Sequence, residues 1–210
     1  MTSSDIKTLA ICVALVAALA LLPDATLYLA LIAFSVMLVL PKGRAFLKTL
    51  GFRQQDNWLK TIGLAVAGWA AVMAVQTIVA NLFPNVFLQE GGGVFADVEG
   101  NTPLFLYSVL SGIVIGGFVE EMLFRGYLLT RLIRIFGDNK ATTFAIVLAT
   151  SLIFAFIHVY QGAAAVVLTG IFSFVVGLIF VRTNYNLWLV ILIHSLFNIV
   201  TFTTLYLGIA

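Results

Sequence analysis

The chain has 210 residues, of which 62% are hydrophobic and only 10% are charged. Soluble domains carry roughly 45–50% apolar and roughly 25% charged residues, and the mean hydropathy here is +1.12. Too little polar surface is present to keep the chain dissolved, which excludes a soluble enzyme, a disordered tail and a nucleic-acid-binding protein. Cys12 is the only cysteine, so no disulfide can form within the chain.

Seven apolar stretches are candidates for crossing a bilayer, which needs about 20 residues per helix. The first two are short and are joined by a tight turn at Pro23 and Asp24, so we expect a hairpin that tilts or stops short of full crossing. The composition and these stretches together predict an all-α polytopic membrane protein with about seven transmembrane helices. The stretches are Ile6–Leu22, Thr26–Leu40, Trp58–Phe83, Pro103–Thr130, Ala141–Tyr160, Ala163–Val181 and Leu187–Leu207.

The basic residues predict how the chain is oriented. With the N-terminus in the cytoplasm and all seven stretches crossing, ten of the eleven Lys and Arg residues fall on the cytoplasmic side. The eleventh, Arg125, lies inside a span, and the charged residues of the outer loops are all acidic. Because cytoplasmic loops are enriched in Lys and Arg, we predict a cytoplasmic N-terminus and a C-terminus outside.

The longest outer loop, residues 84–102, follows three spans within residues 1–83 that carry no specific motif. Its run Gly91–Gly93 predicts flexibility, so the loop is interpreted as a lid or as a plain connector. In the fourth span, Gly112 and Gly116 have the spacing of small residues that lets two helices approach closely. These features indicate organisation and packing, and carry no chemistry of their own.

Ionisable side chains inside the spans are the most informative feature of the sequence. Each costs roughly 2.5–3.5 kcal/mol on membrane-insertion scales, so such residues indicate a functional site. Both histidines of the chain are among them. The polar set consists of Glu120, Glu121 and Arg125 on the fourth span, His158 on the fifth, and His194 with Asn198 on the seventh.

The two adjacent glutamates differ in their predicted partners. Glu121 and Arg125 are four residues apart, so they share a helix face and can pair. Glu120 points about 100° away from that face and has no partner on its own helix. We therefore interpret Glu120 as the chemically active carboxylate; the alternative is that both acids only join helices through ion pairs.

The histidines have the same four-residue spacing to a neighbour on their helix face. Phe154 precedes His158, and His194 precedes Asn198. The side chains of His194 and Asn198 can both donate hydrogen bonds. Each pair alone is also explained by contacts between helices. Taken together, and with neutral histidines, the polar set carries one net negative charge, which a proton, a protonated histidine or a metal cation must offset. Each option fits hydrolysis by a carboxylate base or by a metal site.

The depths of these residues do not agree if every helix begins at the membrane surface. At 1.5 Å per residue, Glu120 and His194 lie about 12–15 Å from the cytoplasmic end of their spans, whereas His158 lies about 27 Å from Lys140. Either the fifth helix begins in the cytosol, or it is strongly tilted, or its boundary lies elsewhere. Thr142 and the threonine that follows it favour the first explanation.

Three short motifs in this order resemble the CPBP family of intramembrane proteases, which includes CAAX prenyl endopeptidases of the Ras-converting type and bacteriocin-processing or immunity proteins. The resemblance covers about half of the chain, from Pro103 to Thr203, and places a CPBP-like catalytic core within residues 103–210. The motifs are Glu120-Glu121-x-x-x-Arg125, Phe154-x-x-x-His158 and His194-x-x-x-Asn198.

The resemblance implies a helical membrane fold with a cavity among the motif-bearing helices, and peptide hydrolysis without a covalent enzyme intermediate. It implies that Glu120 activates water, that His158 positions this water and shares its proton, and that His194 and Asn198 stabilise the oxyanion. The neighbouring glutamate and arginine of the first motif, Glu121 and Arg125, are implied to be the structural ion pair.

A metal cofactor is left open, because the family is described both as metalloproteases and as glutamate proteases. Two histidines and one glutamate are an acceptable zinc set, which would consist of Glu120, His158 and His194. However, the His-Glu-x-x-His motif is absent, and Asn198 beside His194 suits an oxyanion hole better. We therefore favour no cofactor, with zinc as the alternative.

The expected partners are a peptide or lipidated-peptide substrate and the lipid bilayer, with no nucleic acid, and the expected location is a prokaryotic plasma membrane. Two other functions stay open. One is a non-catalytic membrane scaffold or bacteriocin-immunity protein of the same fold. The other is a proton-coupled transporter, which usually shows inverted repeats and broken helices; neither is recognisable in the sequence.

Overall fold

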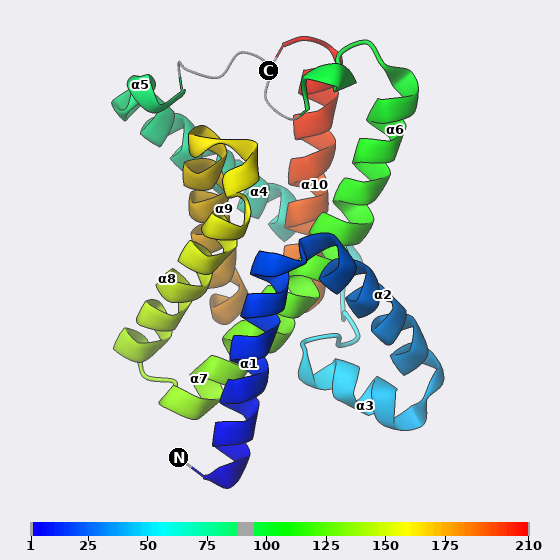
Figure 1. The fold of residues 1–210 in the computed structure, drawn as a ribbon, viewed down its shortest axis with the longest axis vertical. Helices are drawn as coiled ribbons and strands as arrows, with labels where there is room; N and C mark the ends of the chain where they lie inside the picture. Colours follow the sequence, from blue (N-terminus) through cyan, green and yellow to red (C-terminus); the bar gives the residue numbers. More distant parts are fainter. Residues whose placement is uncertain (1, 88–94, 210) are drawn as a thin grey trace.

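The computed structural model describes residues 2–87 and 95–209. Within these ranges the chain is helical and contains no strand, which confirms the prediction of an all-α fold. The glycine run predicted to be flexible, Gly91–Gly93, lies outside the described residues. Figure 1 shows that α1 begins near one end of the long axis of the molecule and that α10 ends near the other.

The N-terminal part forms a hairpin and two further helices. α1 and α2 are separated by one residue, Leu22, and both α2 and α3 begin with proline, which suits the first turn of a helix. A bend of 118° separates α2 from α3, and α3 is an amphipathic helix that the sequence analysis did not predict. These helices are α1 (Ser3–Leu21), α2 (Pro23–Val39), α3 (Pro41–Thr49) and α4 (Trp58–Leu82).

The middle of the chain contains one helix of 35 residues, Thr102–Phe136. About half of it, within Gly112–Leu129, is π-helical, a rare conformation that is frequent at functional sites, whereas the sequence-based prediction assumed the α-helical period. In Figure 1 it runs obliquely through the molecule, from α6 to α7. The segments are α5 (Pro84–Phe87), η1 (Ala96–Val98), α6 (Thr102–Ser111), π-helical η2 (Gly112–Glu120) and η3 (Met122–Leu129), and α7 (Thr130–Phe136).

The C-terminal part consists of three long helices and one short turn of helix. α8 and α10 begin at asparagines whose side chains accept a hydrogen bond from a backbone N–H of the first turn, as α4 and α6 also do. Such caps satisfy one of the unpaired donors at each helix start. The elements are α8 (Lys140–Ile157), η4 (Val159–Gln161), α9 (Ala163–Arg182) and α10 (Leu187–Tyr206).

Six helices of the described chain are long and apolar enough to cross a membrane, and a seventh crossing results if α2 and α3 count as one bent span. The polytopic prediction is therefore confirmed. The stretch Thr26–Leu40, which was expected to tilt or to stop short of full crossing, forms a helix of 17 residues that ends at the bend before α3. The predicted side of each terminus stays a prediction.

Close approaches between helices fix the core. α10 packs against η2 and α4, and α9 packs against α8. A Cβ on Gly177 would lie 3.0 Å from Val147 of α8, and one on Gly112 would lie 2.9 Å from Asn198 of α10. The absence of a side chain at Gly112 and Gly116 therefore lets η2 and α10 meet, as their spacing predicts. The hairpin of α1 and α2 contacts α7, α8 and η2 from outside this core.

Candidate functional site

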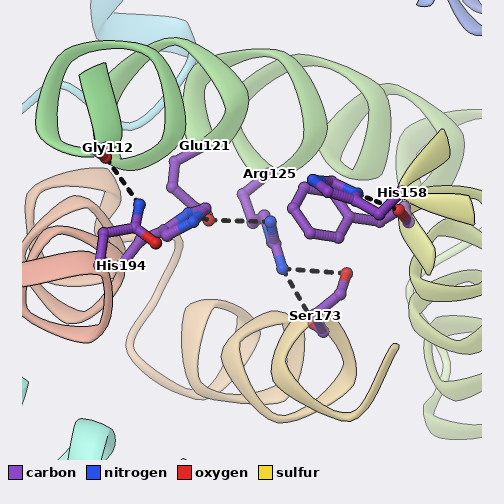
Figure 2. A network of polar contacts seen from close by, with 8 residues as sticks. Gly112, Glu121, Arg125, His158, Ser173 and His194 are labelled. Atoms are coloured by element: carbon purple, nitrogen blue, oxygen red, sulfur yellow. Dashed lines mark hydrogen bonds and ion pairs between the residues drawn. The ribbon is translucent and has the colours of Figure 1, made fainter. Parts of the chain in front are cut away.

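One group of polar residues lies inside the helix bundle and is joined by ion pairs to one oxygen of Glu121, while its other oxygen, Oε2, is buried without a hydrogen-bond partner in the described chain. Glu121 is 0% exposed, and its Oε1 accepts a hydrogen bond from Arg125 Nη1 at 2.9 Å. His194 Nδ1 lies 2.7 Å from the same oxygen, and because a carboxylate oxygen can only accept, Nδ1 carries the proton. Figure 2 shows this row of side chains between η2–η3 and α10. We call Glu121, Arg125, His194 and Ser173 the paired centre.

Both terminal nitrogens of the Arg125 guanidinium donate hydrogen bonds to groups of the described chain. Its Nη2 donates to the backbone oxygen of Ser173 at 3.1 Å and to the hydroxyl of Ser173 at 3.0 Å. Its Cζ also lies 5.0 Å from the ring centroid of Phe154 and 5.9 Å from that of Phe172. Cation–π contacts of this kind gain strength where the cation is desolvated. A buried cation is tolerated here because charge, hydrogen bonds and aromatic faces all surround it.

Glu120 has a different environment from its neighbour. It lines a pocket of about 610 Å³ together with His158, and it forms no hydrogen bond or ion pair with another residue of the described chain. The remaining walls are mostly apolar and come from the α1–α2 hairpin, from α8 and from the turn after it. They include Val16, Leu19, Ala20, Leu27, Ile153, Phe156, Ile157, Val159 and Tyr160. A carboxylate without a partner therefore faces an apolar pocket.

His158 caps the C-terminal end of α8, and a contact with the helix shows which nitrogen of its ring carries a hydrogen. Its Nδ1 lies 2.7 Å from the carbonyl oxygen of Phe154, which can only accept, so Nδ1 carries the hydrogen. The ring also packs against Phe154, with centroids 4.6 Å apart. In the neutral ring Nε2 is left as an acceptor. His158 can therefore take a hydrogen bond from a water molecule in the pocket.

The mismatch in depth is resolved by the oblique course of the helix that carries Glu120 (Figure 1). α8 begins at Lys140, as predicted, and His158 lies at its far end. Because the helix Thr102–Phe136 crosses the molecule at an angle, Glu120 reaches the pocket at the end of α8.

Neither His194 nor Asn198 lines the pocket that contains Glu120 and His158. Asn198 Nδ2 donates to the backbone oxygen of Gly112 at 2.7 Å. A Cβ on Gly116 would lie 2.6 Å from Asn198 Nδ2 and 3.4 Å from His194 Nε2. Both side chains therefore pack on the glycine face of η2. Glu120 follows Gly116 by four residues, so it lies close to the continuation of this face.

The predicted site residues thus fall into two neighbouring groups. Glu120 and His158 share the pocket, whereas Glu121, Arg125 and His194 form the paired centre (Figure 2). The ring of Phe154 contacts both groups, since its centroid lies 4.6 Å from that of His158 and 6.3 Å from that of His194. The sequence analysis also gave no role to the α1–α2 wall of the pocket.

Ser173 is a further residue that the sequence analysis missed. Its hydroxyl and backbone oxygen both accept from Arg125, but a lone serine in an apolar helix is a weak signal. The only available hint was its place as a small polar residue in the middle of the sixth predicted span. Small hydroxyl side chains there often bond to neighbouring helices.

The residues do not fit the zinc alternative. Within residues 2–87 and 95–209, no three His, Cys, Asp or Glu side chains form a group that could hold a metal ion. Glu120, His158 and His194 are therefore not gathered as a catalytic zinc site would require.

Comparison with known proteins adds one match. Residues 102–200 match a family model described as type II CAAX prenyl endopeptidase Rce1-like. No curated protein and no solved structure matches the chain. The matched segment contains Glu120, Glu121, Arg125 and both histidines, whereas the α1–α2 wall of the pocket lies outside it.

Proposed function

We propose that this chain, which belongs through residues 102–200 to the Rce1-like family of type II CAAX prenyl endopeptidases, is an intramembrane endopeptidase with Glu120 as its catalytic base. The family is one of proteases, and the helices provide a membrane protein. The observation that carries the assignment of Glu120 is its place, without a partner in the described chain, in one pocket with His158.

In the proposed reaction a water molecule lies between Glu120 and His158. Glu120 takes a proton from this water while His158 Nε2 accepts its second hydrogen bond, and the oxygen attacks the carbonyl carbon of the scissile peptide bond. The C–N bond then breaks, and the proton held by Glu120 passes to the leaving amine. General acid–base groups of this kind contribute about 10²- to 10⁴-fold to a rate.

We assign oxyanion stabilisation to His194 and Asn198. Asn198 uses one of its two amide hydrogens on Gly112, so the other is left for the substrate. His194 donates from Nδ1 to Glu121, and it can donate from Nε2 only when the ring is protonated. Both groups pack against Gly116, which precedes Glu120 by four residues on the same helix, and this position supports their assignment near the reacting carbonyl.

The proposed substrate is a membrane-associated peptide, prenylated as in CAAX proteins or otherwise lipidated. The apolar wall formed by Leu19 and Leu27 of the α1–α2 hairpin supports this assignment, because such a surface favours lipid or apolar side chains over charged ones. A prokaryotic plasma membrane is the proposed location.

Cleavage of a peptide library by the purified chain in detergent or liposomes tests the proposal. Glu120→Gln keeps the size of the side chain and removes the base, so cleavage should be lost. Glu99→Gln, at an exposed glutamate in the loop before the fourth predicted span, is the matched control and should cleave like the wild type. Cleavage that persists in Glu120→Gln contradicts the role of Glu120.

The same preparation separates the two alternative functions. Flux of ions or solutes into liposomes without any cleavage would indicate a transporter. Absence of both cleavage and flux, with correctly folded protein, would indicate a scaffold or immunity protein. Either result would overturn the proposed hydrolase.

A further inference from the structure

A second pocket, of about 430 Å³, lies away from Glu120 and collects positive charge. It is formed by the end of α3 and the link that follows, by α7 and the turn after it, and by the turn between α9 and α10. Lys48, Arg53 and Arg134 line it, with Asp138 as the one carboxylate. In Figure 1, α3 and α7 lie toward the same end of the molecule as the start of α1, which is the cytoplasmic end in the predicted orientation.

The three cations of this pocket are not neutralised within the described chain. The two salt bridges of the described chain both involve Glu121, in the paired centre. Asp138 therefore forms no ion pair with Lys48, Arg53 or Arg134. Arg53 Nη2 donates to the backbone oxygen of Thr183 at 2.8 Å, which holds its guanidinium at the pocket without removing its charge. The pocket therefore has an excess of positive charge.

The wall opposite these cations is a turn held in an unusual backbone conformation. Asn184 and Tyr185 have φ angles of 53° and 61°, and among the described residues they alone, glycines aside, have positive φ. This region is disfavoured for side-chain-bearing residues, above all for a bulky one such as Tyr185. Tyr185 N donates to the backbone oxygen of Phe180 at 2.8 Å, which keeps the turn closed. Asn184 also lines the pocket; its backbone N–H donates to the oxygen of Val181, whereas its side-chain amide has no hydrogen bond within the described chain.

We propose that this pocket binds the phosphate-bearing headgroup of an anionic phospholipid. Basic pockets between transmembrane helices on the cytoplasmic side suit such headgroups, and three cations with a free amide provide donors for phosphate oxygens. Phe136, on the last turn of α7 beside the pocket, is 52% exposed and offers apolar surface for an acyl chain. Free phosphate shares the headgroup chemistry, and the test separates the two sources.

The positive-inside distribution alone places lysines and arginines at this end of the spans, so a matched control is needed. Lys42 and Arg44 supply it: they lie on α3, as Lys48 does, are exposed and do not line the pocket. Lys48→Gln with Arg134→Gln removes two charges from the pocket. Lys42→Gln with Arg44→Gln removes the same charge from the surface outside it.

The experiment measures binding of phosphatidylglycerol, phosphatidylcholine and inorganic phosphate to the full chain in neutral detergent, by native mass spectrometry and by the shift of the thermal unfolding midpoint. We expect phosphatidylglycerol to bind to the wild type and to the control variant, Lys42→Gln with Arg44→Gln. It should raise the thermal unfolding midpoint of both. The pocket variant should bind it at least about tenfold more weakly, as the loss of about 1.4 kcal/mol would produce. Phosphatidylcholine and inorganic phosphate should have no effect.

Three results would overturn the inference. Equal weakening in both double variants would indicate general surface charge, and equal binding of the two lipids would show that headgroup charge is not recognised. A shift with inorganic phosphate as large as with phosphatidylglycerol would replace the lipid by a soluble anion. If the pocket variant fails to fold, a photoreactive phosphatidylglycerol on the wild type must crosslink to the end of α3 or to α7; crosslinks elsewhere contradict the site. None of these readouts depends on peptidase activity.

Discussion

Two adjacent glutamates on one helix have different environments, and the difference indicates which of them is suited to a structural role and which to a catalytic one. Glu121 belongs to the paired centre, where an arginine and a histidine share one of its oxygens. Glu120, the preceding residue, faces a pocket with no partner in the described chain. A carboxylate that is held by an arginine and a histidine is stabilised in its ionised form and is a poor base, whereas one without an ion-pair partner beside an imidazole can accept a proton. Under the proposed function, one acid of this helix holds the bundle together and the other takes part in the reaction.

The largest expected effect is on catalysis by the pocket. Glu120→Gln should lower kcat/KM by about 10⁴-fold, the upper range for a general base, while the free energy of unfolding changes by less than about 1 kcal/mol. Initial rates with a cleaved peptide and unfolding in mixed micelles measure the two quantities. A large loss of stability in this variant would mean that Glu120 is structural after all.

The paired centre should show the opposite behaviour. Arg125→Ala leaves Glu121 as a buried charge without its counter-ion, so the free energy of unfolding should fall by about 3–5 kcal/mol. Arg44→Ala, at an exposed position on α3, is the control and should change it by no more than about 0.5 kcal/mol. Denaturant titration in micelles gives both values, and equal effects would contradict the contrast between the two regions.

Asn198 connects the two regions and should have an intermediate effect. Removing one oxyanion donor typically costs about 10²- to 10³-fold in rate, so Asn198→Ala should lower kcat by that factor without abolishing activity. Asn81 also donates its amide to a backbone carbonyl but lies on α4, so Asn81→Ala should cleave normally. An unchanged kcat in Asn198→Ala would remove this residue from the mechanism.

A smaller effect is expected at the apolar wall of the pocket. Leu27→Trp fills space next to Glu120 and should lower kcat/KM by about tenfold through weaker substrate binding, a typical size for shape changes in apolar pockets. Leu29, on the same helix, is 65% exposed and does not line the pocket, so Leu29→Trp is the control. Similar values for both variants would place substrate elsewhere.

Chelation should have no effect on the rate. Since Glu120, His158 and His194 are not gathered as a metal site in the described chain, cleavage should continue unchanged after extended dialysis against a chelator. Zinc added back should likewise not raise the rate. A rate that falls on dialysis and returns with zinc would contradict the water-and-carboxylate mechanism.

Local pattern was enough to predict the spans and the ion pair. Six long apolar stretches appear as helices that can cross a membrane, because a bilayer requires long runs of apolar residues. The pairing of Glu121 with Arg125 follows from a spacing of four residues on one helix. The same reasoning missed α3, since its nine residues are amphipathic and fall short of a span.

Contacts between helices could not be predicted in this way. The sequence offered His194 as a partner for any acid in the membrane, and only the packing of α10 against η2 brought it to Glu121. The pocket also depends on Leu19 and Leu27, whose apolar side chains look like those of any lipid-facing helix. Nothing in the residue types of the hairpin indicates which face covers the site.

The amino-acid sequence alone therefore determined that the chain is a helical membrane protein with buried acids and imidazoles, because the cost of placing such groups in a bilayer makes their positions meaningful. Only the tertiary structure decided that His194 is a second partner of Glu121 and that Glu120 shares a pocket with His158. The positions of these side chains depend on the oblique course of the long helix and on the close approach of α10 at Gly116. Both arise from packing between segments that are far apart in the sequence.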